Sequence, residues 1–465
     1  MSKVHFIGVG GSGMSAVAKL TAAAGHQVTG SDQRVSHYFE ALEDAGMSVV
    51  IGHDAALVDG VDQVVISTAV RDTNPELVRA RELGVEIVHR SEALARALDD
   101  QRLLAVAGSH GKTTTSAMAA HACHAAGVDA SFAVGARVLG VEGAVAGGYA
   151  GSAGIAVVEA DESDGSFLRY HPEVAILLNI EPDHLDYYGT VERLHDAFEE
   201  FAKDCRVLVA CVEDPVVMDI VARVQAAGVQ VITYGRDNAD VVVTSDTVVR
   251  DGHEYPFEVP VPGVHMRLNA AAAWAAATSM GADPALAAAG MATFRGTGRR
   301  FQARGEADGV RVIDDYAHHP TEVAALLAAA RTAPVATTAP AAGAVASQGA
   351  RLVVLFQPAL FTRTQLHAAN FARALSVENA DIIVAGVHGD REDPIDGVNS
   401  DLIVDQMDVP TGSTAVVIED LDAAALHAAT VARPGDIILT VGSGPVTDTG
   451  DAILDALRER ELSRE

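Results

Sequence analysis

The chain has 465 residues, of which 49% are hydrophobic, and its 33 basic and 63 acidic side chains give a formal net charge of −30. At roughly 150 residues per domain, this length allows about three domains with filled cores. The negative charge opposes nonspecific attraction to nucleic acid and to anionic membranes, so we expect neither as a partner. A strand starts within four residues of the N-terminus, and no apolar run reaches about 18 residues, which predicts neither a signal peptide nor membrane insertion. A cytoplasmic enzyme is the simplest class.

The three cysteines, Cys123, Cys205 and Cys211, stand in ordinary apolar or loop settings. They have no CxxC spacing, so the sequence supports neither a disulfide framework nor a zinc site. We expect reduced thiols in the core.

Residues 1–100 alternate short β-rich runs with helical patterns. The runs are "VHFIGV", "QVTG", "SVVI", "QVVIST" and "VEIV", and the clearest helical patterns cover 12–24 and 74–83. This rhythm is typical of βαβ units and predicts a parallel sheet in a first α/β domain.

Residues 101–298 repeat the pattern. "LLAVAG" leads through a glycine loop into a helix over 112–126, and strands follow in "GIAVVEAD", "VAILLNI", "RVLVAC" and "VQVITYG". Short alternating strands between 239 and 261 predict a small antiparallel sheet attached to this second α/β domain. An alanine-rich helix is expected to open at Asn269.

Residues 299–465 alternate a third time, from "VRVIDDY" through "RLVVLF", "ADIIVAG", "STAVVIED" and "DIILTVG", each followed by a helical segment. The predicted fold class is therefore α/β with three α/β domains. Residues 332–350 carry no charge and are mostly Ala, Thr, Pro and Gly, which predicts a flexible surface loop inside the third domain.

The first glycine loop follows an apolar strand. Gly8, Gly10 and Gly13 spell GxGxxG, the pattern that places a pyrophosphate on a helix N-terminus. Asp32, nineteen residues after Gly13, fits a nicotinamide dinucleotide. By itself this loop favours an NAD-dependent oxidoreductase.

A second loop, "AGSHGKTTT", lies between a strand and a helix at 107–115. Its backbone N–H groups, Lys112 and Thr113 are suited to ATP phosphates and Mg²⁺, although Val106 stands where the full GxxxxGK[ST] pattern needs glycine. Two acidic runs after later strands, "VVEADESD" and "NIEPDHLDYYG", are compatible with a metal. The loop predicts either an ATP-using enzyme or a regulatory module that binds ATP and changes shape.

Seven motifs stand in order along the chain: "GVGGSGM", "GSHGKTTT", "EADESD", "NIEPDHLD", "RRF", "DDYAHHPTE" and "FQPALFTRT". In this set the chain resembles the Mur ligases. The resemblance implies an N-terminal Rossmann-like domain for a UDP-substrate, a central ATPase domain and a Rossmann-like C-terminal domain that closes over the site. The first glycine loop then holds the diphosphate of a UDP-sugar.

The resemblance also implies roles for single residues. ATP is assigned to Gly108, Ser109, His110, Gly111, Lys112, Thr113, Thr114, Asn269, Arg300, Asp315 and Tyr316. The UDP-sugar and amino-acid substrates are assigned to Gly8, Gly10, Gly11, Ser12, Gly13, Met14, Ser31, Asp32, Ser67, Thr68, His318, His319 and Arg363. Mg²⁺ is assigned to Thr113, Glu159 and His184, and catalysis to Lys112, Glu159, His184, Arg300 and Asp315.

The implied reaction is ATP-dependent joining of L-alanine to the lactyl carboxylate of UDP-N-acetylmuramate through an acyl phosphate, the first peptide-adding step of peptidoglycan precursor synthesis. Family members that add later residues carry a lysine about four turns after the histidine, where this chain has Phe198. That absence favours the alanine-adding member, acting as a monomer or homodimer. A ligase that recycles a whole peptide onto the same UDP-sugar is the nearest alternative.

Three positions depart from the family pattern. Met266 in "HMRLN" replaces an asparagine, and Ala359 in "FQPA" replaces a histidine near the amino-acid end of the site. Ala317 in "DDYAHHP" replaces a glycine, which is tolerable if its φ is negative. His318 and His319 are candidates for the base that accepts the proton of the amine.

Overall fold

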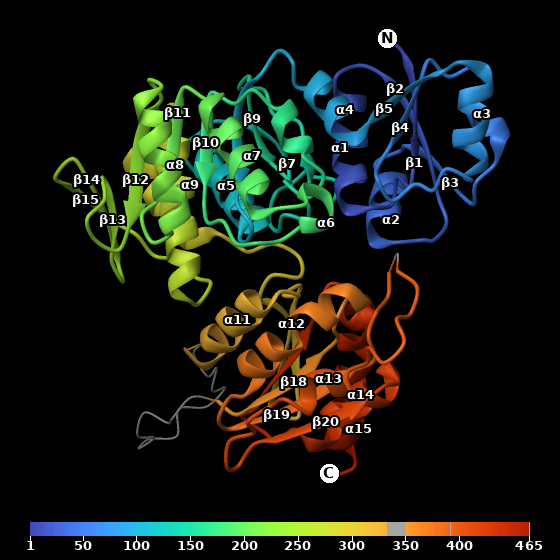
Figure 1. Ribbon diagram of the computed structural model, residues 1–465, viewed down its shortest axis with the longest axis vertical. Helices are drawn as coiled ribbons and strands as arrows, with labels where there is room; N and C mark the ends of the chain where they lie inside the picture. Colours follow the sequence, from blue (N-terminus) through green and yellow to red (C-terminus); the bar gives the residue numbers. More distant parts are fainter. Residues whose placement is uncertain (333–349, 391, 465) are drawn as a thin grey trace. The chain divides into compact units, whose positions relative to one another are not determined.

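The computed structural model describes residues 1–332, 350–390 and 392–464. The expected flexible loop lies outside the described residues, apart from its two end positions. Three sheets with helices between their strands confirm the predicted α/β class (Figure 1). The chain forms two compact units, one of residues 1–260 and 266–298, the other of residues 261–265 and 299–465.

The N-terminal sheet is parallel, with strand order β3-β2-β1-β4-β5. Its five strands and the helices α1 and α3 lie where the sequence predicts them, because apolar strand residues such as Phe6 and Val65 are buried between helices. The elements are β1 Lys3–Ile7, α1 Ser12–Ala23, β2 Gln27–Asp32, α2 His37–Asp44, β3 Ser48–Ile51, η1 Ala55–Val58, β4 Gln63–Ile66, α3 Pro75–Leu83, β5 Glu86–His89 and α4 Arg90–Ala97.

The central sheet has ten strands in the order β15-β14-β13-β12-β11-β10-β6-β9-β7-β8. The predicted antiparallel strands β13–β15 are present, but they extend the central sheet because β13 pairs with β12. The first elements are β6 Arg102–Ala107, α5 Lys112–Ala125, β7 Ser131–Ala133, β8 Gly148–Tyr149, β9 Ile155–Glu159, η2 Ser166–Arg169, β10 Val174–Leu177, α6 Leu185–Tyr188, α7 Val191–Lys203 and β11 Val207–Cys211. The remainder are α8 Pro215–Ala226, β12 Gln230–Gly235, β13 Val241–Val243, β14 Thr247–Arg250, β15 His253–Pro256, α9 Val264–Ser279, α10 Pro284–Gly290 and η3 Met291–Thr293.

Helix α9 begins at Val264, so the predicted start at Asn269 is wrong by five residues. Gly263 has φ +115° immediately before the helix and turns the chain there. The first helical turns include the polar His265 and Arg267. The prediction placed the start of the helix at the alanine run and therefore left these turns out.

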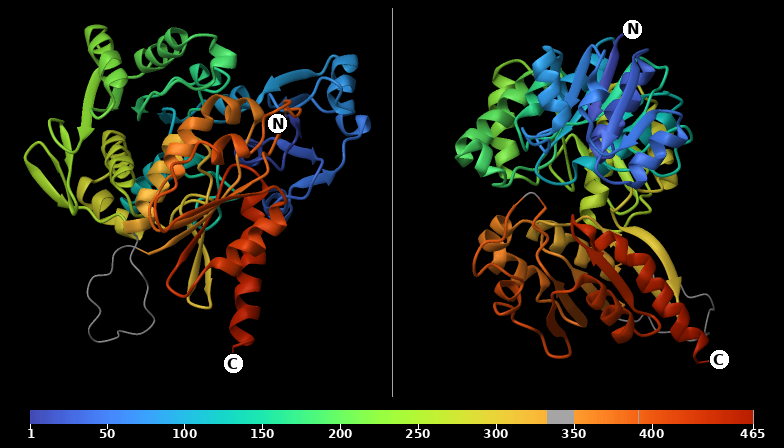
Figure 2. Two further views of the ribbon diagram at one scale, coloured as in Figure 1. Left: turned by 60° about the horizontal axis from the view of Figure 1, so that its bottom comes forward. Right: turned by 90° about the vertical axis from the view of Figure 1, so that its right-hand side faces the viewer.

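The C-terminal sheet has the order β16-β17-β21-β18-β19-β20, parallel except for β16. Alternate residues of β18 enter opposite cores: Val354 packs with α11 and α12, and Val353 packs with α14 and α15. Helix α15 packs against β16 and β17 (Figure 2). The elements are β16 Gln302–Ala307, β17 Val310–Asp315, α11 Pro320–Thr332, β18 Leu352–Phe356, α12 Phe361–Leu375, β19 Ala380–Ala385, α13 Asp401–Val404, β20 Thr414–Ile418, α14 Leu421–Val431, β21 Ile437–Val441, η4 Pro445–Asp448 and α15 Thr449–Leu462.

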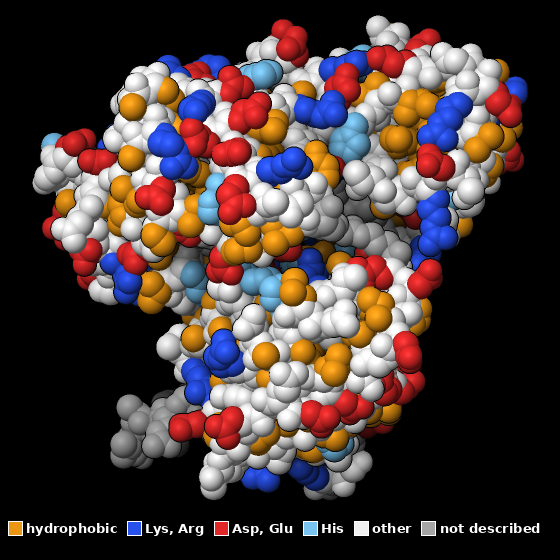
Figure 3. All heavy atoms as spheres, in the orientation of Figure 1, with side chains coloured by type: hydrophobic (Ala, Val, Ile, Leu, Met, Phe, Trp, Pro, Cys, Tyr) orange, Lys and Arg blue, Asp and Glu red, His pale blue; other side chains and the backbone are white. Residues whose placement is uncertain are grey.

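The acidic side chains are spread over the face drawn in Figure 3, with Lys and Arg between them. None of the helices in the described part of the chain is long and apolar enough to cross a membrane. Cys123, Cys205 and Cys211 are free and buried, which confirms the expectation of core thiols.

Candidate active site

The second glycine loop joins β6 to the N-terminus of α5. Gly108 has φ +140° and Gly111 has φ +86°, both in the region that favours glycine. A Cβ at Gly108 would come within 2.9 Å of Leu178 Cβ, and one at Gly111 within 3.1 Å of the Asn269 side-chain amide. The loop therefore packs closely against its neighbours and leaves a helix N-terminus at its end, a geometry that favours an anion.

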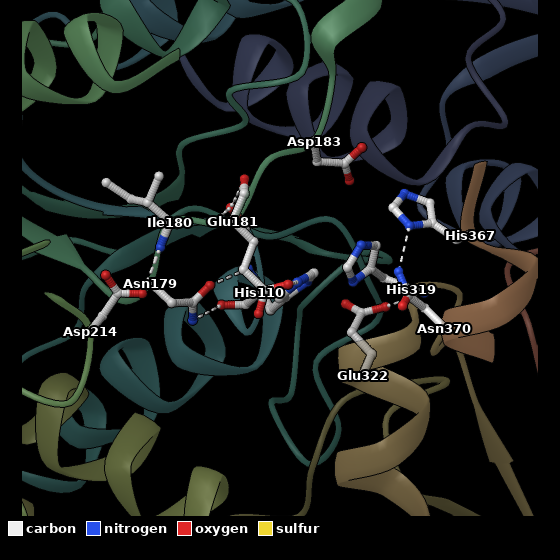
Figure 4. Close-up of polar contacts among 12 residues, drawn as sticks. His110, Asn179, Ile180, Glu181, Asp183, Asp214, His319, Glu322, His367 and Asn370 are labelled. Carbon is white, nitrogen blue, oxygen red and sulfur yellow. Dashed lines mark hydrogen bonds and ion pairs between the residues drawn. The ribbon is translucent and has the colours of Figure 1, made fainter. Parts of the chain in front are cut away.

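Asn179, just after β10, holds this loop in place. The backbone N–H of His110 donates to Asn179 Oδ1 at 2.8 Å, and Asn179 Nδ2 donates to the His110 carbonyl at 3.0 Å (Figure 4). The N–H of Ser109 donates to the Asn179 carbonyl at 2.9 Å. Asn179 was not among the expected site residues, although its place after a strand next to β6 is a signal for it.

Lys112 points back over the loop and into the first acidic run. Its ammonium group donates to the Gly108 carbonyl at 2.8 Å and lies 2.7 Å from Glu162 Oε2. Burial lowers the pKa of Lys112, but the surrounding carboxylates, Glu162 foremost, outweigh burial and raise that pKa. The lysine is thus a fixed cation at the phosphate loop. Glu162 belongs to the acidic run "VVEADESD" that was expected to suit a metal, although the resemblance gave it no role of its own.

Two of the three expected magnesium ligands are in contact. Thr113 Oγ1 donates to Glu159 Oε1 at 2.8 Å, and the N–H of Gly135 donates to Glu159 Oε2 at 2.7 Å. A hydroxyl and a carboxylate beside a phosphate loop fit the oxygen ligands that Mg²⁺ prefers. The third expected ligand, His184, has φ +54°, and its Nε2 lies 3.8 Å from Glu162 Oε1. Thr114 is buried in α5.

The first glycine loop is bonded to the end of β2. The N–H groups of Gly8 and Val9 donate to the Ser31 carbonyl at 2.8 and 3.0 Å. The N–H of Gly10 donates to Asp32 Oδ2 at 2.9 Å. The structure therefore brings the loop and Asp32 together, as expected for one nucleotide site. Of the other expected substrate residues, those of the loop are Gly11, Ser12, Gly13 and Met14, with Ser12 opening α1, while Ser67 and Thr68 follow β4.

Arg90, the first residue of α4, lies against this loop and was missed from the sequence. A Cβ on Gly13 would come within 2.3 Å of Arg90 Nη1, so a larger residue there would require the guanidinium to move. Arg90 Nη2 is also 3.6 Å from Asp161 Oδ2 in the central domain. The N-terminus of α1 thus has a cation beside it, as a diphosphate site needs.

In the C-terminal unit, Arg300, Asp315 and Tyr316 come together. The guanidinium of Arg300 lies 5.0 Å from the centre of the Tyr316 ring. Asp315 accepts hydrogen bonds from the N–H groups of Phe301 at 2.7 Å and Ala317 at 2.8 Å. Burial raises the pKa of Asp315 to about 6, although Arg300 and these bonds act against it. Ala317 does not adopt a positive φ, so the glycine of the family pattern is dispensable there.

Glu322 organises the two expected histidines. Its Oε2 accepts from the N–H groups of His318 at 3.0 Å and His319 at 3.3 Å, at the start of α11. His319 lies beside His367, with 5.1 Å between ring centres. Glu322 ends the "DDYAHHPTE" motif but was not an expected site residue.

The expected carboxylate-binding residue lies on a neighbouring helix of this unit. Arg363 is in the first turn of α12 and is half-buried. Ala359, just before that helix, is buried and pairs with His388 in an isolated parallel bridge.

Family models match most of the chain: "Mur ligase family, catalytic domain" at residues 3–102, "Mur ligase middle domain" at 106–277 and "Mur ligase, glutamate ligase domain" at 299–444. The chain belongs to the Mur ligase family. This Mur ligase is 45% identical to the UDP-N-acetylmuramate–L-alanine ligase of Kineococcus radiotolerans, covering 99% of this chain and 97% of that one. It is 46% identical to the enzyme of that name from Renibacterium salmoninarum, covering 98% and 96%.

Among solved structures, this Mur ligase is similar to the UDP-N-acetylmuramate-alanine ligase of Thermotoga maritima. The two share 28% identity and a TM-score of 0.80, with full coverage of both chains. A murein peptide ligase from Psychrobacter arcticus has 24% identity and a TM-score of 0.70, covering 98% and 99%, which shows a shared fold.

Proposed function

We propose that this chain is the ATP-dependent ligase that joins L-alanine to UDP-N-acetylmuramate, an early step toward peptidoglycan. The observation that carries the proposal is a phosphate loop with Lys112 and a Thr113–Glu159 pair in a chain whose relatives at 45% and 46% identity bear that name. We assign UDP-sugar binding to residues 1–100 and ATP binding to residues 101–298. Residues 299–465 are assigned as the C-terminal ligase domain. The reaction is expected in the cytoplasm, by a monomer or homodimer.

The chemistry follows from the substrates. A carboxylate resists attack because its charge repels nucleophiles and its oxygen is a poor leaving group. Transfer of the γ-phosphoryl group of ATP to the lactyl carboxylate breaks the bond to ADP and forms an acyl phosphate. The neutral amine of L-alanine then attacks the carbonyl carbon, a C–N bond forms, phosphate leaves and the amine gives up a proton.

Phosphoryl transfer requires positioning and charge compensation more than covalent catalysis. Lys112 and the N-terminus of α5 supply positive charge at the loop, and Asn179 keeps the loop in shape. Thr113 and Glu159 would hold Mg²⁺, with His184 as the proposed ligand of a second ion. Bound Mg²⁺ would neutralise charge on the phosphate oxygens.

The C-terminal residues receive proposed roles from their own surroundings. Arg300, held over Tyr316, and the buried Asp315 are assigned to ATP. His318 or His319, whose backbone N–H groups both donate to Glu322, is assigned to accept the proton of the amine. Arg363 is assigned to the carboxylate of L-alanine.

The test is Mg²⁺-dependent ADP release from ATP with UDP-N-acetylmuramate, comparing L-alanine, glycine, L-serine and an alanyl peptide. Lys112→Ala is the inactive variant, and Lys203→Ala is its matched control because Lys203 is an exposed lysine of the same domain. Release that needs both the UDP-sugar and L-alanine supports the proposal. Turnover with the peptide alone would identify a recycling ligase instead, and NAD binding without UDP-sugar binding would indicate an oxidoreductase.

A further inference from the structure

Glu76, in the first turn of α3, is fully buried and accepts four hydrogen bonds. Its Oε1 accepts from His53 Nδ1 at 3.2 Å and from the N–H of Asp54 at 3.1 Å. Its Oε2 accepts from His5 Nε2 at 3.1 Å and from Ser31 Oγ at 2.7 Å. The Glu76 carboxylate, on α3, is therefore hydrogen-bonded to residues of β1, of β2 and of the segment after β3.

This arrangement uses the full accepting capacity of a carboxylate, two donors on each oxygen. Burial raises the pKa of Glu76, but the hydrogen bonds from His5 and Ser31, together with the charges of neighbouring histidines, outweigh burial and lower that pKa, so the group is ionised. The bond to Glu76 also orients the ring of His53, and because an ionised carboxylate only accepts, it assigns a proton to Nδ1. No described residue hydrogen-bonds to His53 Nε2, and 13% of that side chain is exposed.

Ser31 connects Glu76 to the glycine loop. Ser31 gives its hydroxyl to Glu76, while its carbonyl accepts the N–H groups of Gly8 and Val9 at 2.8 and 3.0 Å. The next residue, Asp32, accepts from Gly10 through its side chain and from the Gly52 N–H through its carbonyl at 2.7 Å. Glu76 is therefore linked to the glycine loop through Ser31, and His53 adjoins the same residue, with its Nδ1 3.1 Å from Ser31 Oγ.

We propose that Glu76 is a positioning residue of the nucleotide-sugar site, and that His53 is the group it presents there, offering the lone pair of Nε2 to a donor of the UDP-sugar. This inference rests on the proposed function, in which the N-terminal domain binds UDP-N-acetylmuramate. Ser31, an expected substrate residue, gives its hydroxyl proton to Glu76 and holds the glycine loop through its carbonyl.

The test is calorimetric binding of UDP-N-acetylmuramate and of ATP to the full chain, together with steady-state kinetics. Glu76→Gln keeps the shape of the side chain but replaces one carboxylate oxygen, which accepts hydrogen bonds, with an NH₂ group. That NH₂ group would face the donors that now bond to Glu76. We expect it to weaken UDP-N-acetylmuramate binding about tenfold or more. ATP binding and kcat at saturating UDP-sugar should stay within about twofold, a split that general loosening of the fold would not produce.

Two further variants complete the design. Glu82→Gln, on the same helix with a 61% exposed side chain, is the matched control and should bind like the wild type. In His53→Asn, the side-chain amide can still donate to Glu76 in place of Nδ1, but no atom replaces Nε2. This variant should therefore weaken UDP-sugar binding and leave ATP binding unchanged. It also tests the inference if Glu76→Gln does not fold.

Unchanged UDP-sugar binding in Glu76→Gln or His53→Asn would overturn the inference, as would equal losses for ATP and UDP-sugar. A wild-type chain that does not bind UDP-N-acetylmuramate would overturn the proposed function as well. The wild-type titration therefore separates the two failures.

Discussion

Lys112 and Glu162 form a buried ion pair at the phosphate loop, with 2.7 Å between Nζ and Oε2 and with 13% and 2% of the two side chains exposed. The attraction of Lys112 lowers the pKa of Glu162, yet burial is stronger and raises that pKa to about 7. Burial thus disfavours the charge of each group, and the attraction between the two opposes that effect.

Lys112→Ala should therefore cost stability as well as activity. The variant leaves Glu162 buried without its cation, and breaking a buried pair costs up to about 3–5 kcal/mol, less where the remaining group takes up a proton. Lys112→Ala with Glu162→Gln should regain most of that loss but no ADP release. Chemical denaturation and the ADP assay measure the two effects, and a single variant as stable as the wild type would contradict the pairing.

Arg90 and Gly13 make a second coupled pair. Arg90→Ala removes the cation from the N-terminus of α1 and should weaken UDP-N-acetylmuramate binding by about 1.5–3 kcal/mol, the range for hydrogen bonds to charged groups. Gly13→Ala should weaken UDP-N-acetylmuramate binding too, because the added Cβ would lie 2.3 Å from Arg90 Nη1 and the guanidinium would have to move. The effects should be less than additive in the double variant. Full additivity in titrations of all three variants would show that Arg90 acts elsewhere.

The sequence predicted most of the fold because burial follows local patterns. The five N-terminal strands alternate with amphipathic helices, and each lies where its apolar run does. β16 was not predicted because "QARGEA" has few apolar residues and depends on pairing with β17. β13 could be predicted as a strand, but its pairing with β12, which merges the antiparallel strands into the central sheet, is a tertiary contact.

The candidate site residues were assigned from motifs, but a motif does not show which of its residues make contacts across the chain. The phosphate loop, Glu159 and Asp315 belong to recognisable motifs of the Mur ligases. Asn179 opens the motif "NIEPDHLD", yet its partner lies 69 positions away, and Glu76, outside the motifs, bonds to a residue 45 positions away. No local spacing indicates such partners, so these residues become visible only when the strands are placed side by side.

The cysteines give a simple check of the core. Burial raises the pKa of Cys123 and Cys205 to about 12 and also raises that of Cys211. A thiol reagent at pH 8 should therefore label the native chain slowly, since the thiolate is the reactive form. The denatured chain should react at all three positions. Rapid labelling of the native protein, located by peptide mass, would show which helix or strand opens.

Asp315 should make the C-terminal unit less stable as pH rises. Burial raises its pKa from 3.8 to about 6, so between these values the folded state holds a proton that the unfolded state has lost. Stability from this group is full below about pH 4 and falls through about pH 6, by up to about 3 kcal/mol. The unfolding free energy of the wild type relative to Asp315→Asn should decline across this range. Asp451→Asn, an exposed aspartate of the same unit, should show no such trend. Since Arg300 lowers the pKa of Asp315, Arg300→Ala should move the decline to higher pH, and a difference constant from pH 4 to 7 would refute the assignment.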